Sequence, residues 1–317
     1  MNNIPTITDI RQAAKRIQKY IHRTPVLTSA NINQIAGAEL FFKCENFQKV
    51  GAFKARGATN AVFSLTDEEA SRGVATHSSG NHAAAMALAA RFRGIPAYIV
   101  MPRTAPPVKK KAVEGYSAEI TFCEPTLQAR EAGLEAVVER TGAAFIHPYN
   151  DYRIIAGQAT ASLELLEEIE RVDVVLTPVG GGGLTSGTAL TVKYLSPETR
   201  MIATEPEMAD DAYRSFRDGK IYPSVNPQTI ADGLLTSLGD KTFGIITKYV
   251  DDIVTVSEKS IIAAMRLIWE RMKIVVEPSA AVPLAAIVSG RLDVSGKRAG
   301  IILSGGNVDL DQLPWVK

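Results

Sequence analysis

The chain has 317 residues, of which 46% are hydrophobic and 22% charged, and its formal net charge is +1. This composition is ordinary for a globular protein of one or two domains, and it gives no electrostatic reason to expect a nucleic-acid partner. No apolar run reaches the ~18–20 residues of a membrane span, so no membrane partner is expected. The N-terminus has no signal-like apolar core, and Cys44 and Cys123 lie in strand-like runs, which predicts buried thiols. A cytoplasmic location is therefore the default expectation.

Short β-rich runs alternate with longer helical runs along the chain. Several of the β-rich runs are apolar throughout, which is typical of parallel strands buried on both faces. The predicted strands cover residues 39–45, 73–78, 97–102, 118–124, 143–149, 172–179, 200–206, 251–256 and 298–305. The helical runs include residues 83–92, 126–140, 159–171 and 260–272. This alternation predicts an α/β fold with mostly parallel sheets flanked by helices.

The stretch TPVGGGGLTSG, residues 177–187, contains four consecutive glycines between a predicted strand and a helical run. Such a loop presents free backbone N–H groups and the positive end of a helix dipole, which together can hold a phosphate. No Lys-Ser or Lys-Thr pair follows the glycines, so this is no Walker loop, and the first predicted strand lacks a dinucleotide fingerprint. The alternative is a tight strand–helix turn that packs closely against other parts of the protein.

Two further glycine-containing turns follow predicted strands. THSSGNHAAAMALAA (76–90) passes through Ser-Ser-Gly-Asn into an alanine-rich helix, whose first amides can hold an anion or can simply be capped. IILSGGNVDL (301–310) passes through Ser-Gly-Gly-Asn. Ligands of open α/β sheets bind beyond the carboxyl ends of the strands, so the three turns predict one crevice.

Lys54 lies between Phe53 and Ala55 in the segment GAFKARG. Most lysines are solvated surface charges, and that is the alternative here. A lysine that is partly desolvated loses its proton more easily and becomes a nucleophile toward carbonyl groups. A reactive lysine combined with a phosphate loop predicts a phosphorylated aldehyde, and pyridoxal 5′-phosphate is the obvious candidate.

The sequence resembles the serine racemase and serine/threonine dehydratase group of fold-type II pyridoxal-phosphate enzymes, and it is most similar to the branch that includes threo-3-hydroxyaspartate dehydratases. The resemblance covers nearly the whole chain. It rests on RTPV (23–26), KCENFQKVGAFKARGA (43–58), SSGNHA (78–83), IPAYIVMP (95–102), GGGGL (180–184), TIADGL (229–234), VDDI (250–253) and LSGGNVDL (303–310).

The resemblance implies two open twisted, mostly parallel sheets, as in the tryptophan synthase β subunit. Residues 1–67 and 149–317 would form a large cofactor-binding domain, and residues 68–148 a small substrate-side domain. A homodimer is also expected from the resemblance.

The resemblance also implies roles for individual residues toward the cofactor. Lys54 would bind it covalently as an internal aldimine, with Phe53 and Asn81 flanking the ring and Ser304 at the pyridine nitrogen. The glycine loop would cradle the phosphate through Gly180, Gly181, Gly182 and Gly183.

The substrate would be a small hydroxy amino acid, namely serine, threonine or 3-hydroxyaspartate. Its α-carboxylate would bind at the turn from Ser78 to Asn81, where His82 would also contact it. Ser79 resembles the acid/base on the face opposite Lys54. Arg130 would bind a second carboxylate, or else it is a surface arginine on a helix. The remaining histidines, His22, His77 and His147, are interpreted as structural.

TEPEMADDAY (204–213) matches the divalent-metal segment of the racemase-like branch. It would bring Glu205, Asp211 and the backbone carbonyl of Ala209 together, and oxygen ligands suit Mg²⁺ or Ca²⁺. A solvated acidic loop is the alternative.

The sequence therefore predicts a pyridoxal-phosphate-dependent ammonia-lyase that dehydrates and deaminates a hydroxy amino acid to a 2-oxo acid and ammonia, and that also allows racemase activity. One alternative is an enzyme that is mainly a serine or aspartate-type racemase. Others are a nucleotide-binding oxidoreductase, which the missing fingerprint disfavours, and a non-catalytic cofactor-binding protein, which the intact lysine and serines disfavour.

Overall fold

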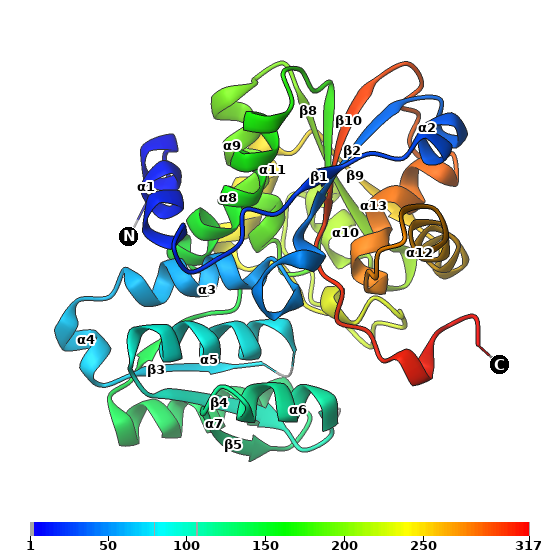
Figure 1. Ribbon diagram of the computed structural model, residues 1–317. Helices are drawn as coiled ribbons and strands as arrows, with labels where there is room; N and C mark the ends of the chain where they lie inside the picture. Colours follow the sequence, from blue (N-terminus) through cyan, green and yellow to red (C-terminus); the bar gives the residue numbers. More distant parts are fainter. Residues whose placement is uncertain (1–2, 79, 106, 317) are drawn as a thin grey trace.

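The computed structural model describes residues 3–78, 80–105 and 107–316, and within them ten strands form two sheets (Figure 1). The large sheet has the order β1-β2-β10-β7-β8-β9, and only its β1–β2 pair is antiparallel. The small sheet has the order β5-β4-β3-β6 and is parallel throughout. The predicted α/β class with mostly parallel sheets is confirmed.

The strands of the large sheet are β1 (Val26–Leu27), β2 (Glu39–Cys44), β7 (Val174–Pro178), β8 (Arg200–Pro206), β9 (Asp252–Val256) and β10 (Arg298–Leu303). Those of the small sheet are β3 (Val74–His77), β4 (Ala97–Pro102), β5 (Glu119–Cys123) and β6 (Ala144–Phe145). The helices are α1 (Ile7–Ile17), α2 (Ala30–Ala36), α3 (Lys54–Phe63), α4 (Asp67–Ser71), α5 (Asn81–Arg93), α6 (Pro107–Glu114), α7 (Leu127–Thr141), α8 (Tyr152–Glu168), α9 (Gly183–Leu195), α10 (Asp211–Asp218), α11 (Asp240–Tyr249), α12 (Glu258–Met272) and α13 (Pro278–Val288).

Helices cover both faces of the large sheet because its central strands are apolar on both sides. Leu176 and Ile301 pack with α2, α12 and α13 in one core, whereas Val175 and Met201 pack with α8, α9 and α11 in another. The side chains of neighbouring strand residues point to opposite faces, so one strand supplies both cores. The large sheet is thus a buried platform, and helix α1 packs outside it against α8.

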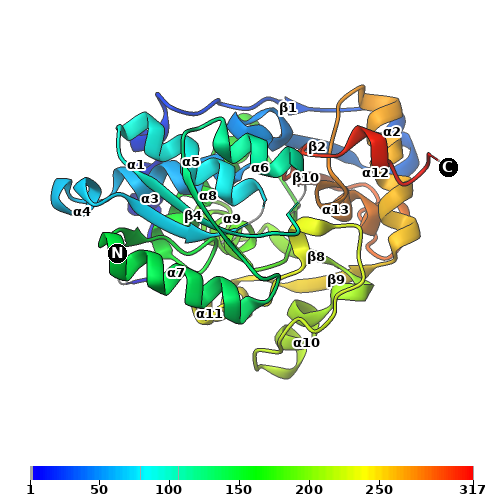
Figure 2. The ribbon, with the colours of Figure 1, turned by 90° about the horizontal axis from the view of Figure 1, so that it is seen from below.

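The small sheet has the same sandwich in miniature. Ile99 and Met101 of β4 pack against α5, and Val100 between them packs against α7 on the opposite face (Figure 2). Six of the thirteen residues of α5 are alanine, and these small side chains let the helix pack closely against both the small sheet and α3. Helix α3 lies between the two sheets, and its first residue is Lys54 (Figure 1). All four strands of the small sheet fall within residues 68–148, while the domain boundaries themselves stay a prediction.

Three local predictions need correction, and one strand was missed. The predicted strand 143–149 is paired only over Ala144–Phe145, because the chain then turns toward the large sheet. The predicted helix 159–171 begins earlier and ends earlier in the structure, as α8, Tyr152–Glu168. The two-residue strand β1 was not predicted. Cys44 is fully buried as expected, but Cys123 is only partly buried, because it lies at the end of the edge strand β5.

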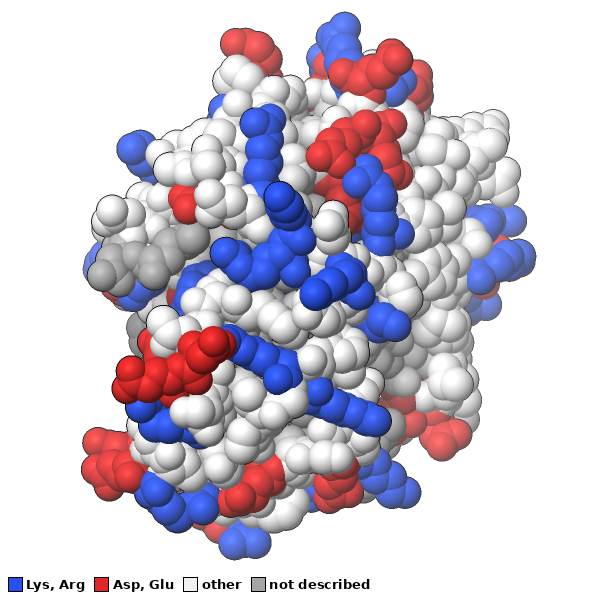
Figure 3. All heavy atoms as spheres, turned by 60° about the vertical axis from the view of Figure 1, so that its left-hand side comes forward, with Lys and Arg blue, Asp and Glu red and all other residues white. Residues whose placement is uncertain are grey.

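The surface carries charges of both signs. On the face drawn in Figure 3, Lys and Arg side chains form a band across the middle, with groups of acidic side chains above and below it. Among the described helices, none is long and apolar enough to cross a membrane.

Candidate active site

A cavity of about 380 Å³ opens where the carboxyl ends of strands from both sheets meet. Its lining includes the ends of β3, β7 and β10, so the three glycine turns do share one crevice. The predicted site residues that line it are Phe53, Lys54, Ser78, Asn81, His82, Arg130, Gly180, Gly181, Gly182, Gly183 and Ser304. Ser79 lies outside the described residues. The predicted metal ligands Glu205, Ala209 and Asp211 do not line the cavity.

Lys54 is half-buried at the start of α3, and its Nζ donates a hydrogen bond of 3.0 Å to the carbonyl oxygen of Pro148. Burial lowers the pKa of Lys54 to about 8, and the nearby Glu277 carboxylate only partly opposes this. Phe53 packs beside it, with the lysine Nζ 5.2 Å from the ring centroid. The backbone N–H of Phe53 bonds the carbonyl of Ser304, so the lysine and the third turn are tied together. A much larger share of Lys54 is therefore neutral and nucleophilic near pH 8 than of an exposed lysine.

The glycine loop leads from β7 into α9, whose N-terminus has no side-chain cap. None of the described residues offers a backbone acceptor to the N–H groups of Gly180, Gly181 and Gly182. Three donors are thus left for a ligand at the positive end of a helix, which is an arrangement that suits a phosphate group. This feature fits a phosphorylated cofactor.

Close packing, which the sequence analysis gave as the alternative to a phosphate site, explains the missing side chains of the loop. A Cβ on Gly181 would lie 2.4 Å from the Tyr149 ring, and one on Gly180 would lie 2.9 Å from the Cα of Leu234. Gly182 has φ +85°, a conformation that side chains disfavour. Protein atoms fill the space beside these glycines, so close packing, the alternative explanation, accounts for their lack of side chains.

The N-terminus of α5 faces the same cavity. The N–H of Ser78 is already bonded to the carbonyl of Val100, and that of Gly80 donates to the Ser78 hydroxyl at 3.3 Å. The expectation that the whole turn offers its amides to a carboxylate is therefore wrong for Ser78. Within the described part of the chain, the N–H groups of Asn81 and His82 have no acceptor. An anion at this helix would bind these two groups.

Glu277 is a buried carboxylate in the cavity lining that the sequence analysis missed. The Asn81 amide donates to both of its carboxylate oxygens at 3.2 Å, and Asn307 donates in turn to the oxygen of Asn81. Glu277 is 196 residues from Asn81 in the sequence, so no local pattern reports the contact. Its only local signal is the helix start at Glu277-Pro278.

Burial lowers the pKa of each histidine around the cavity, which favours the neutral form. Burial, followed by the charge of Lys54, holds the pKa of His82 well below its usual value, and burial lowers the pKa of His147 to about 4. The Nδ1 of His147 accepts hydrogen bonds from the N–H groups of Tyr149 and Asn150, which agrees with a structural role. His77 was also interpreted as structural, but it lines the cavity.

Arg130 lines the cavity from helix α7 and is partly buried. Burial and the charge of Arg130 lower the pKa of His77, so the guanidinium acts on the carboxyl end of β3, where His77 lies. Its Nε donates a long hydrogen bond of 3.4 Å to the Thr126 carbonyl. No ion pair with Arg130 occurs among the described residues, so its charge is open to an anionic ligand.

Glu205 and Asp211 form a buried pair of carboxyl groups at the end of β8. They are 0% and 1% exposed, so the alternative of a solvated acidic loop is wrong. Burial raises the pKa of Asp211 to about 6 and the pKa of Glu205 well above its usual value, and neighbouring carboxylates add to both effects. Glu205 also accepts the N–H groups of Ala212 and Tyr213 at the start of α10. The described residues contain no group of three or more His, Cys, Asp or Glu side chains arranged around a metal site.

A nucleophilic lysine and two helix N-termini with free N–H groups, at the carboxyl ends of parallel strands, define a class of enzymes that hold a phosphorylated aldehyde. The chain belongs to the family described as "Pyridoxal-phosphate dependent enzyme", whose model matches residues 17–305. The resemblance found in the sequence is thereby confirmed at the level of the family.

Individual relatives narrow the group. The chain is 55% identical over 312 residues to the β-hydroxyaspartate dehydratase of Paracoccus denitrificans (strain Pd 1222), covering 98% of this chain and 99% of that protein. The crystal structure of serine racemase from Dictyostelium discoideum is 52% identical, with a TM-score of 0.93, covering 96% of this chain and 99% of that one. The crystal structure of the T.th. threonine deaminase is 44% identical, with a TM-score of 0.91, over 96% of this chain and 99% of that one.

Proposed function

We propose that the protein is a pyridoxal-phosphate-dependent ammonia-lyase that eliminates water from a hydroxy amino acid and releases a 2-oxo acid and ammonia. The observation that carries this proposal is Lys54, a lysine of lowered pKa in a cavity that also offers free N–H groups from the glycine loop and from α5. The names of the relatives above support the same reaction type. Bound pyridoxal phosphate supplies an electron sink next to the substrate Cα.

Lys54 is the residue that moves the proton. Its neutral amine takes the Cα proton of the bound amino acid, and the β-hydroxyl then leaves with a proton as water. Hydrolysis of the dehydrated product returns one water and gives the 2-oxo acid and ammonia, so the net reaction is a deamination. The Pro148 carbonyl orients the lysine Nζ whenever the amine is free, at the 3.0 Å contact seen here. Phe53 would pack against the cofactor, and Ser304 would bond its ring nitrogen.

Two other parts of the cavity lining, the start of α5 and Arg130, select the substrate. The N–H groups of Asn81 and His82 bind the α-carboxylate at the start of α5. Arg130 binds a second carboxylate, which 3-hydroxyaspartate has and serine and threonine lack. We therefore propose that 3-hydroxyaspartate is used at least as well as serine.

Three further features belong to the same proposal. Ser79 would act as acid/base on the face opposite Lys54 and support racemisation. Glu205, Asp211 and the Ala209 carbonyl would hold Mg²⁺ or Ca²⁺, since a cation would compensate the negative charge of two carboxylates that burial otherwise disfavours. Residues 1–67 with 149–317 and residues 68–148 would form the two domains of a cytoplasmic homodimer.

A substrate panel tests the reaction. The holoenzyme is given L- and D-serine, L-threonine and the threo and erythro forms of 3-hydroxyaspartate, and ammonia, 2-oxo acid and epimer are measured. We expect ammonia and 2-oxo acid in equal amounts from at least one hydroxy amino acid. Epimer formation without ammonia would instead identify a racemase, and a yellow protein with neither product would identify a non-catalytic cofactor-binding protein.

Arg130→Ala tests the substrate choice. A charge-assisted hydrogen bond contributes about 1.5–3 kcal/mol, so kcat/KM for 3-hydroxyaspartate should fall ~10- to 150-fold while that for serine changes little. Arg140→Ala is the matched control, because Arg140 lies on the same helix but pairs with Glu119 at the surface. Equal losses on serine and 3-hydroxyaspartate would contradict the role of Arg130.

A further inference from the structure

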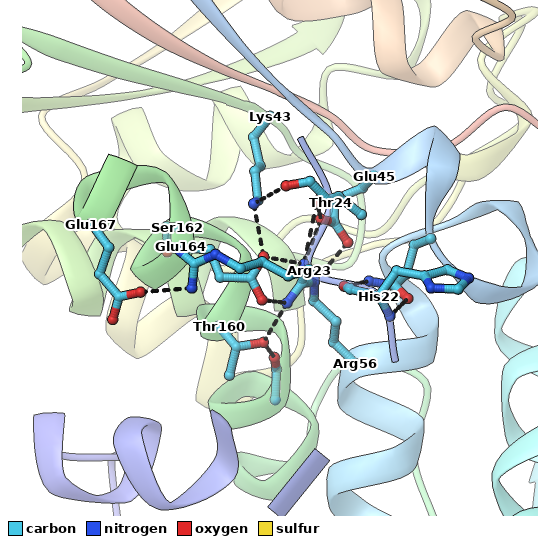
Figure 4. Close-up of polar contacts among 12 residues, drawn as sticks. His22, Arg23, Thr24, Lys43, Glu45, Arg56, Thr160, Ser162, Glu164 and Glu167 are labelled. Atoms are coloured by element: carbon cyan, nitrogen blue, oxygen red, sulfur yellow. Dashed lines mark hydrogen bonds and ion pairs between the residues drawn. The ribbon is translucent and has the colours of Figure 1, made fainter. Parts of the chain in front are cut away.

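A buried ionic cluster lies directly behind the lysine, outside the cavity. Arg56 is two residues beyond Lys54 in the first turn of α3, and its side chain is 0% exposed. We call the residues around it the Arg56 cluster (Figure 4); it consists of Thr24, Lys43, Glu45, Arg56, Thr160 and Glu164. None of these residues lines the cavity, so the reaction proposed above does not use them.

The guanidinium of Arg56 is held from two sides. Its Nε and Nη2 donate to the two oxygens of Glu45 at 2.7 and 2.8 Å, and its Nη1 and Nη2 donate to the two oxygens of Glu164 at 2.7 and 2.8 Å. The Thr160 hydroxyl accepts a further bond from Nη1 at 3.2 Å. Two bidentate pairs fix the plane of the guanidinium, which a point-like ammonium group could not do.

The rest of the cluster balances its charge. Lys43 is also fully buried, and its Nζ contacts Glu164 at 2.7 Å and the Thr24 carbonyl at 2.6 Å. The Thr24 hydroxyl donates to Glu45 at 2.5 Å. Two cations thus face the carboxylates of Glu45 and Glu164, and the Lys43 Nζ also lies 3.5 Å from the partly exposed carboxylate of Glu168. The cluster joins two of the sequence motifs, RTPV (23–26) and KCENFQKVGAFKARGA (43–58), to helix α8.

The cluster connects the start of α3 to two rigid elements. Glu45 directly follows strand β2, and Glu164 lies on α8. Helices α3 and α8 meet at glycines, since a Cβ on Gly157 would lie 2.6 Å from the Cα of Gly57. Such a contact brings the helices close but has no side chain to fix the rotation of α3 about its axis near Lys54. Farther along α3, the Asn60 amide donates to the Arg153 carbonyl of α8 at 2.7 Å. Arg56 supplies that constraint on one side of Lys54, and the bond from Phe53 to the Ser304 carbonyl supplies one on the other.

Stability alone is a weak reason to bury such a cluster. Desolvation of buried ion pairs offsets most of their attraction, and well-packed apolar side chains are often as stable. Directional bonds do, however, fix geometry, and a misplacement of ~1 Å at a reacting group can cost up to ~100-fold in rate.

We propose that Arg56 is a positioning residue, which aims Lys54 at the cavity by bridging Glu45 and Glu164. This inference rests on the proposed role of Lys54 as the lysine that binds the cofactor. It predicts that the geometry of the guanidinium matters, and that a positive charge alone at position 56 is not enough.

The experiment measures how fast the cofactor-free protein binds pyridoxal phosphate covalently. The visible absorption of the lysine–cofactor bond is followed in time, and borohydride reduction with peptide mapping identifies the lysine. We expect Arg56→Lys to slow bond formation and to lower kcat at least ~10-fold. Glu164→Gln, which keeps the shape but loses the charge, should slow both in the same direction, and it replaces Arg56→Lys if that variant does not fold.

Arg93→Lys is the matched control. Arg93 is a largely buried arginine that bonds the carbonyls of Val62 and Leu65, at the opposite end of α3. The Arg93→Lys change should lower the unfolding temperature but leave the rate of covalent cofactor binding within about twofold of wild type. This is expected because Arg93 constrains only the end of α3 that is far from Lys54.

Two results would overturn the inference in distinguishable ways. If Arg56→Lys and Glu164→Gln unfold earlier but bind the cofactor and turn over at wild-type rates, the cluster is purely structural and the proposed function is unaffected. If the wild-type protein forms its covalent bond at a lysine other than Lys54, the proposed function fails as well.

Discussion

The proposed chemistry of this protein depends on one side chain, Lys54, and on the burial that lowers its pKa to about 8. The pKa of Lys54 is lower in the folded protein than in the unfolded chain. Between about pH 8 and the usual lysine pKa of ~10.4, the unfolded state therefore binds more protons, and the cofactor-free protein gains stability as the pH rises. The same shift makes Lys54 nucleophilic at a pH where exposed lysines are not.

A pH profile checks this shift. The rate at which the cofactor-free protein bonds pyridoxal phosphate should rise with a midpoint near pH 8 and then level off, because the neutral amine is the reacting form. Glu277→Gln should move the midpoint to lower pH, since the Glu277 carboxylate favours the charged lysine. A rate that keeps rising past about pH 10, in either protein, would mean that Lys54 has an ordinary pKa.

Among individual site residues, the sequence predicted those whose immediate neighbours in the chain form an unusual pattern. Lys54 and the glycine loop have local signals, because apolar neighbours and consecutive glycines are unusual. Pro148 has none and Glu277 has only a helix start, because their contacts with the cavity residues span 94 and 196 residues of sequence. Such contacts come from the packing of the two sheets, which no short pattern encodes.

At the scale of elements, the glycine loop combines two requirements. It must lie against Tyr149 and Leu234, and it must leave its N–H groups free at the start of α9. The free N–H groups were the prediction, and the close packing was given only as its alternative. The first half of α8 was also missed in the sequence. Its residues Ile154, Ile155, Ala156 and Gln158 are all buried, so this half of the helix has no polar face and therefore no helical periodicity to detect.

Gly181→Ala tests the packing of the loop. The new Cβ would lie 2.4 Å from the Tyr149 ring, and such overpacking costs typically about 1–3 kcal/mol. We expect a lower unfolding temperature and weaker cofactor binding. Gly244→Ala is the matched control, because this helical glycine has nothing within 4 Å of an added Cβ and the change should be neutral or stabilising. Equal unfolding temperatures for the two variants would contradict this account of the loop.

At the scale of the whole molecule, the fold places two sheets so that their carboxyl ends share one cavity. The pattern of strands was enough to predict the α/β class, and the shared cavity followed from the positions of the glycine turns. Strand β1 was not predicted, because two residues are too few to show alternation, and β6 was predicted too long, as residues 143–149.

The buried carboxyl groups of Glu205 and Asp211 predict that a bound metal ion stabilises the whole molecule. Mg²⁺ or Ca²⁺ should raise the unfolding temperature of the chelator-treated protein, because an ion that binds only the folded state stabilises it by about 2.7 kcal/mol at 100 times its Kd. Asp211→Asn should remove the increase. Asp210→Asn is a suitable comparison, since Asp210 pairs with Arg214 nearer the surface. An unfolding temperature that neither ion changes would exclude the site.

The most direct test of the central claim is the release of ammonia and 2-oxo acid from threo-3-hydroxyaspartate by the wild-type protein and by Lys54→Ala, both saturated with pyridoxal phosphate. We predict equal amounts of the two products from the wild type. Lys54→Ala should release almost none and should lack the visible absorption of the lysine–cofactor bond. Release at the same rate from Lys54→Ala, or the absence of both products from the wild type with every hydroxy amino acid, would contradict the account.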